Sequence, residues 1–195
     1  MFLSADEIRE EIESDRLVID PFEPKLLKTS SYVLRLGEGF RQWKRKAEPV
    51  ELWAQNAGWN HLDPITQAGE INLEPGVVML ASTLEKVGMP NHLVGILSTL
   101  SHLARFGVSV NQNAFWVSPG FGSSNPTQFT LELVSFNPSP VSIKSGIPVC
   151  HLIIARTSKE AHSVLRLHKS VYEGREAPGE PLLFEEFHPI LDRDE

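Results

Sequence analysis

One segment near the middle of the chain carries three kinds of side chain that could act together on a small ligand. Ser101 and Arg105 lie close together, and an isolated glutamate, Glu132, follows in an apolar run. A hydroxyl and a guanidinium can bind phosphate oxygens through hydrogen bonds and charge. A carboxylate in apolar surroundings can take a proton from water, because burial raises its pKa toward the working pH. The residue types therefore predict a pocket that holds a polyphosphate and activates a water.

Each of these residues also has a structural interpretation. Ser101 could satisfy a free amide in the first turn of a short helix. Arg105 could oppose the helix dipole in the last turn of the same helix. Glu132 could be the solvent-facing member of an alternating strand. Taken one residue at a time, the sequence leaves both interpretations open.

The elements that must position these residues are predicted to be mostly β-strands. From residue 31 onward, short apolar runs alternate with Gly, Pro, Asn and Ser, which is typical of β-sandwiches and β-barrels. The N-terminus predicts a helix, since Ser4 and Glu7 have the spacing of a capping box. A short strand is expected at 17–19. Further strands are expected at 32–36, 77–83, 94–97, 107–110, 129–136, 141–143 and 149–155.

Composition excludes several classes of protein. The length of 195 residues suits one domain with an arm, and the net charge of -7 argues against binding nucleic acid backbones or anionic membranes. Cys150 is the only cysteine, which excludes a disulfide within the chain and a paired-cysteine zinc site. We expect Cys150 to act as a buried small hydrophobic residue. No apolar run reaches membrane-spanning length. We expect a soluble, cytoplasmic protein.

Two segments stand apart from the β pattern. Residues 41–62 form a predicted arm, in which Trp43, Trp53 and Trp59 are interleaved with basic residues. Such a mixture could stack on exposed bases. The acidic total charge instead favours indoles that pack on the core or on a neighbouring subunit. Residues 176–195 are rich in Glu and Pro and predict a tail or a lid.

Several short motifs occur in the same order as in the dCTP deaminases, a family that the chain closely resembles. These motifs are Ser30-Ser31-Tyr32-x-Leu34-Arg35-Leu36-Gly37, Ser101-x-Leu103-Ala104-Arg105-x-Gly107, Pro119-Gly120, Leu131-Glu132-Leu133 and Gly146-Ile147-Pro148-Val149. Each motif is weak alone, whereas the ordered set is specific. The resemblance covers roughly residues 2 to 175.

The resemblance implies a dUTPase-like β-barrel or jelly roll with a short N-terminal helix. The domain would span residues 1–175, and the fold would form homotrimers with active sites built from more than one subunit. The resemblance also implies a zinc-free reaction, in agreement with a sequence that lacks the His-x-Glu and Pro-Cys-x-x-Cys pattern of zinc deaminases. Mg²⁺ is expected only as the companion of the nucleotide phosphates, with no metal site in the protein.

The same resemblance assigns roles to individual residues. Glu132 would be the catalytic carboxylate, taking a proton from the attacking water and returning protons to N3 and the departing amine. Ser101 and Arg105 would complete the catalytic group. The substrate-binding residues would be Ala114 beside the base, Ser118 at the sugar, His102 and His151 at the phosphates, and Tyr172 in a segment similar to the nucleotide-closing lid.

Four positions depart from the family pattern and keep alternatives open. Leu100 replaces an arginine, Val33 an aspartate, Ser118 an acid and His151 a glutamine. Leucine cannot make the bidentate hydrogen-bonded contact that a guanidinium makes with phosphate. The leading expectation is deamination of dCTP to dUTP and ammonia. The alternatives are a nucleotide-binding member that has lost the reaction, and a relative that acts on a modified or less phosphorylated pyrimidine nucleotide or has dUTPase activity.

Overall fold

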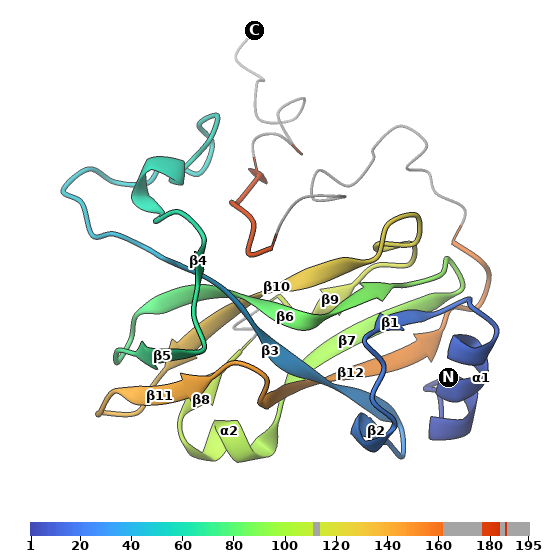
Figure 1. Cartoon of the computed structure of the whole chain (residues 1–195). Helices are drawn as coiled ribbons and strands as arrows, with labels where there is room; N and C mark the ends of the chain where they lie inside the picture. Colours follow the sequence, from blue (N-terminus) through green and yellow to red (C-terminus); the bar gives the residue numbers. More distant parts are fainter. Residues whose placement is uncertain (111–113, 162–176, 184–185, 187–195) are drawn as a thin grey trace, which may run out of the picture.

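A curled sheet of ten strands forms the body of the chain (Figure 1), in a computed structural model that describes residues 1–110, 114–161, 177–183 and 186. Seven strands run in the order β8-β10-β6-β3-β12-β7-β9, while β1 pairs with β6 and both β2 and β4 pair with β3. The strands are β1 Val18–Asp20, β2 Leu27–Lys28, β3 Ser31–Gln42, β4 Thr66–Gln67, β6 Val78–Gly88, β7 Leu93–Thr99, β8 Val108–Ser109, β9 Trp116–Val117, β10 Thr127–Ser135 and β12 Pro148–Arg156. The strands β5 Glu70–Leu73 and β11 Val141–Lys144 form a separate antiparallel pair. The predicted mostly β fold with a short N-terminal helix is confirmed.

Four short helices accompany the strands in the described residues. They are α1 Ala5–Glu13, η1 Pro24–Leu26, η2 Trp59–His61 and α2 Ser101–Arg105. At the start of α1 the Glu7 carboxylate accepts from the Ser4 amide at 2.8 Å, and the Ser4 hydroxyl accepts from the Glu7 amide at 3.4 Å. The predicted capping box is therefore confirmed. No helix within the described ranges has the length and apolar character needed to cross a membrane.

Alternation along β10 decides which of its side chains are available for chemistry. Leu131 and Leu133 are fully buried in the core, and Thr130 and Glu132 point to the opposite face of the strand. On β12, Cys150 is buried, and this burial raises the pKa of its thiol to about 12. The prediction that Cys150 acts as a buried small hydrophobe is confirmed.

All of the expected strands are present, with boundaries that differ by a few residues except in β3 and β6. The strand β3 continues past Leu36 to Gln42, and its register with β6 shifts between Leu36 and Phe40. Gly37 lies within this irregularity, where an added Cβ would stand 2.6 Å from the backbone carbonyl oxygen of Thr83 in β6. The close approach of the two strands therefore requires glycine at this position.

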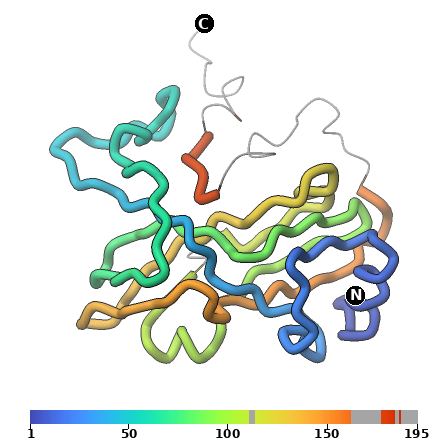
Figure 2. The backbone as a smooth tube through the Cα atoms, in the orientation of Figure 1, coloured from blue at the N-terminus to red at the C-terminus, as the bar shows by residue number. Residues whose placement is uncertain are grey.

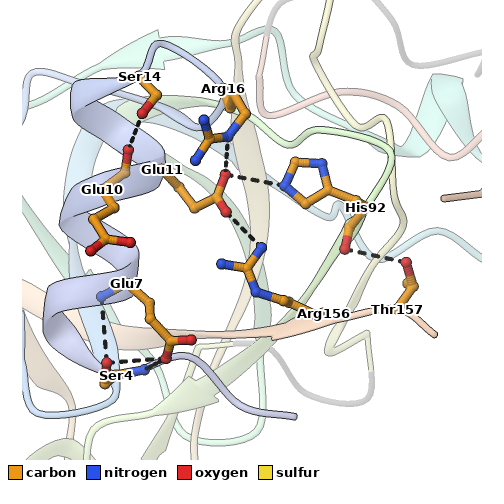
Figure 3. A network of polar contacts seen from close by, with 9 residues as sticks. All are labelled: Ser4, Glu7, Glu10, Glu11, Ser14, Arg16, His92, Arg156 and Thr157. Atoms are coloured by element: carbon orange, nitrogen blue, oxygen red, sulfur yellow. Dashed lines mark hydrogen bonds and ion pairs between the residues drawn. The ribbon is translucent and has the colours of Figure 1, made fainter. Parts of the chain in front are cut away.

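A buried carboxylate attaches α1 to the sheet (Figure 3). Glu11 is only 1% exposed and accepts from Arg16 at 2.7 Å, from Arg156 of β12 at 2.7 Å and from His92 at 3.1 Å. Burial by itself would raise the pKa of Glu11, but the hydrogen bonds from these three partners outweigh it and lower the pKa to about 2. Glu11 therefore stays ionised and links three parts of the chain.

The arm and the last described residues meet beside the sheet (Figure 2). The arm leaves β3, passes through η2 and returns to the sheet at β4. Residues 177–183, drawn in red, lie between the arm and β10. Contacts connect them to both neighbours, since the Trp59 indole donates to the Pro181 carbonyl and the Gly179 amide donates to the Thr130 hydroxyl. Trp59 thus contacts Pro181 of the same chain through its indole nitrogen, while indole packing on the core or on a neighbouring subunit stays a prediction.

Candidate active site

Glu132 lies in a cavity of about 540 Å³, called here the Glu132 cavity. Strands β6, β7, β9 and β10 supply most of its walls, and residues 177–181 close one side. In β10, Glu132 pairs with Leu80 of β6, and Leu80 also lines the cavity. The pairing of β10 with β6 thus holds the carboxylate in a fixed place.

The electrostatic state of Glu132 suits a group that accepts and then returns a proton. Its Oε2 atom is buried and has no hydrogen-bond partner among the described residues. Burial raises the pKa of Glu132 to about 7, and a hydrogen bond from its own backbone partly opposes this. Near neutral pH the carboxyl group therefore divides between its ionised and protonated forms, as general acid and base work requires.

Aromatic and aliphatic side chains form the rest of the cavity. Trp43, Trp116, Phe121 and Phe129 line it, and the last two stack with ring centroids 4.8 Å apart. Among the described lining residues, the charged ones are Glu132 and Glu180, and none is a lysine, arginine or histidine. A flat neutral ring fits such walls, whereas a phosphate group would find no cation on them.

The structure brings together two of the predicted site residues, Ala114 and Glu132, in this cavity. Ser101, His102 and Arg105 lie on α2, are exposed and do not line the Glu132 cavity. Ser118 is exposed, in a turn whose neighbours Val117 and Phe121 do line the cavity. Tyr172 lies outside the described residues.

His151 is not among the described residues that line the Glu132 cavity. It lies on β12, half-buried, and one ring nitrogen is 2.9 Å from the Ser31 hydroxyl. Burial lowers the pKa of His151, and the nearby positive charge of Lys28 lowers it further. The structure therefore does not bring His151, which was predicted to contact the phosphates, to the Glu132 cavity of its own chain.

Sequence reasoning missed several residues that line the cavity. Trp116 is on β9, an edge strand of two residues that shows no periodicity. Pairing of β9 with β7 places Val117 opposite Gly95, and this brings Trp116 to the rim. Trp43, a member of the predicted arm, also lines the cavity. Only the aromatic side chains themselves could have signalled these roles, since the contacts come from strand pairing.

Comparisons with known proteins agree on one family. A family model described as dCTP deaminase-like matches residues 2–157. A protein of Acidothermus cellulolyticus named "dCTP deaminase, dUMP-forming" is 30% identical over 202 residues, which cover 96% of this chain and 98% of that protein. A protein of Mycobacterium sp. strain KMS with the same name is 32% identical over 192 residues, covering 91% of this chain and 93% of its own.

A solved structure is similar in fold. The 2'-deoxycytidine 5'-triphosphate deaminase from Agrobacterium tumefaciens matches with a TM-score of 0.61 and 16% identity, over 86% of this chain and 52% of that chain. The chain thus spans about half the length of that neighbour. At this identity the likeness supports the fold alone.

Proposed function

Since the chain belongs to the dCTP deaminase-like family, we propose that it hydrolyses the C4 amino group of dCTP, with Glu132 as the group that moves the protons. The observation that carries this proposal is the buried Oε2 of Glu132, which has no hydrogen-bond partner among the described residues and lies in an aromatic cavity, in a carboxyl group whose pKa is raised to about 7. A cytosine ring fits between the aromatic walls, and its C4 would face this carboxylate.

The reaction follows from the protonation of one carboxyl group. Ionised Glu132 accepts a proton from a water as the water oxygen bonds to C4 of cytosine, and the protonated carboxyl then donates to N3. Glu132 next carries the hydroxyl proton of the adduct to the amino nitrogen, the C4–N bond breaks, and ammonia leaves with uracil as the product base. Water and dCTP thus yield a deoxyuridine nucleotide and ammonia.

Magnesium enters this proposal as part of the substrate. No group of three His, Cys, Asp or Glu side chains among the described residues is placed to hold a metal ion. We therefore assign Mg²⁺ to the phosphates of dCTP, where it would offset their charge. The two carboxylates that line the cavity would be poor neighbours for bare phosphates.

Ser101 and Arg105 enter the proposal through a second subunit of a homotrimer. They lie on α2, which is exposed and apart from the Glu132 cavity of its own chain. Phe106 and Phe136, at the same corner of the molecule, are 65% and 64% exposed. Large exposed aromatics favour a contact surface between proteins. We infer that α2 of one subunit reaches the cavity of the next and brings the hydroxyl and the guanidinium to the reacting base.

The proposed reaction could release either dUTP or dUMP. A dUMP product is the second candidate. The name of the relatives, dUMP-forming dCTP deaminase, favours it, and it needs a further hydrolysis at the α-phosphate. Position 118, where the resemblance places an acid, holds a serine, which cannot act as a base in that step. We therefore propose dUTP as the released product.

A product assay tests the proposal. The purified protein and Mg²⁺ are given dCTP, dCDP, dCMP, CTP and dUTP, and the products are separated by liquid chromatography. We expect dUTP and ammonia from dCTP, and a fall in kcat of at least about a hundredfold in Glu132→Gln with nucleotide binding retained. Conversion of dUTP to dUMP would favour the second candidate. Binding without any turnover would favour a member that has lost the reaction, and full activity of Glu132→Gln would refute the mechanism.

A further inference from the structure

Residues 177–182 form one wall of the Glu132 cavity, and the arm holds them there. Ala177, Gly179, Glu180 and Pro181 line the cavity, and the side chain of Leu182 is fully buried. These residues come from the end of the described chain, far in sequence from the strands that form the other walls (Figure 1). Their position therefore depends on contacts with other elements.

The first contact is an ion pair between a buried arginine and a half-buried glutamate. Arg41, near the end of β3, is 8% exposed, and its Nη1 lies 2.6 Å from Oε1 of Glu180. The Nε of the same guanidinium donates to the Asp63 carbonyl at 2.8 Å. Without Glu180, the buried guanidinium of Arg41 would lose the charge that offsets its own. Arg41 thus favours the arrangement in which Glu180 stays against the cavity.

Two hydrogen bonds hold the backbone on either side of Glu180. The Trp59 indole of η2 donates to the Pro181 carbonyl at 3.0 Å. The Gly179 amide donates to the Thr130 hydroxyl at 3.1 Å, and Thr130 lies two residues before Glu132 on the same face of β10. Three consecutive residues are therefore attached to β3, to η2 and to β10.

We propose that Arg41 and Trp59 are positioning residues that fix residues 177–182 as a preformed wall of the Glu132 cavity before any nucleotide binds. Fixing a binding surface in advance lowers the ordering cost at the moment of binding. The arm is thereby a support for the substrate cavity, which explains why two of its tryptophans face this region. The kinetic part of the inference rests on the proposed function, whereas the structural part does not.

The experiment uses substitutions that remove single contacts. Trp59→Phe keeps an aromatic ring and loses the N–H donor, and Arg41→Gln removes the charge. Trp53→Phe is the matched control, because the Trp53 side chain belongs to the same arm and is 64% exposed. Since the wall would contribute equally to binding in the ground state and the transition state, we expect KM for dCTP to rise about tenfold with kcat within about twofold of wild type.

Amide hydrogen exchange without nucleotide gives a second readout that needs no turnover. We expect the Gly179 amide to exchange at least about tenfold faster in Trp59→Phe and Arg41→Gln than in Trp53→Phe. If Arg41→Gln fails to fold, Glu180→Gln breaks the same ion pair from the other side. Exchange and KM at the control level in these variants would overturn the inference. Loss of the proposed function would show instead as wild-type turnover in Glu132→Gln, with the exchange result unaffected.

Discussion

At the scale of single residues, Glu132 makes a prediction about pH. Its pKa is raised to about 7 because it is buried, and the proposed reaction begins with its ionised form. Below the pKa the carboxyl is protonated and cannot accept a proton from water, so kcat/KM for dCTP should rise through about pH 7 as Glu132 ionises. Steady-state rates from about pH 5 to about pH 9 measure this. A profile that stays flat around pH 7, or rises only near the ordinary glutamate pKa, would contradict the assigned role.

The residues of the candidate site differ in how far the sequence could predict them. Glu132 and Ala114 were assigned by resemblance to short motifs, and the structure places both on one cavity. Trp43 and Glu180 face the same cavity through contacts that join parts of the chain far apart in sequence. Such contacts depend on the three-dimensional arrangement and leave no local pattern. Motifs therefore indicated the chemistry, and only the fold showed what surrounds it.

At the scale of elements, the long strands were predictable, whereas of the four described two-residue strands only β8 was. Each of β6, β10 and β12 contains an apolar run that sequence reasoning recognised, with boundaries that strand pairing extended. The strands β2, β4 and β9 have two residues each, and their pairing is set by β3 and β7 rather than by their own side chains. These three strands are stabilised by their partners, so single-sequence periodicity carries no signal for them.

The attachment of α1 makes a prediction about stability. Glu11 has its pKa lowered to about 2, so its ionised form stabilises the fold above its unfolded pKa, and this contribution is lost as the pH falls toward about 2. We expect Glu11→Gln to lower the free energy of unfolding by about 3 kcal/mol at neutral pH, and by progressively less below about pH 4. Urea unfolding at several pH values measures the difference. Glu10→Gln, on the exposed face of α1, is the control, and equal stability of the two variants would contradict the anchoring role.

At the scale of the whole molecule, the fold of one chain does not bring the proposed catalytic residues together. Glu132 lies in its cavity, whereas Ser101 and Arg105 lie on an exposed helix outside it. A symmetric assembly can supply the missing side chains, because each subunit then gives its α2 to a neighbour and receives another in return. The exposed Phe106 and Phe136 beside α2 would be covered in the same contact. The proposed trimer and the proposed reaction are therefore one structural hypothesis, and a single experiment can test both.

Subunit mixing is that experiment. Glu132→Gln and Arg105→Gln are each expected to be inactive, and sedimentation equilibrium should show both as trimers. In a one-to-one mixture after subunit exchange, a site is intact when an Arg105→Gln subunit supplies its Glu132 and the adjacent Glu132→Gln subunit supplies its Arg105. Each choice has a probability of one half, so roughly a quarter of wild-type activity should return. Mixing Glu132→Gln with the double variant should restore nothing. The mixture could instead be no more active than the two variants measured separately and added together. That result would mean that Arg105 and Glu132 act in a site of the same subunit, or that Arg105 takes no part in the reaction.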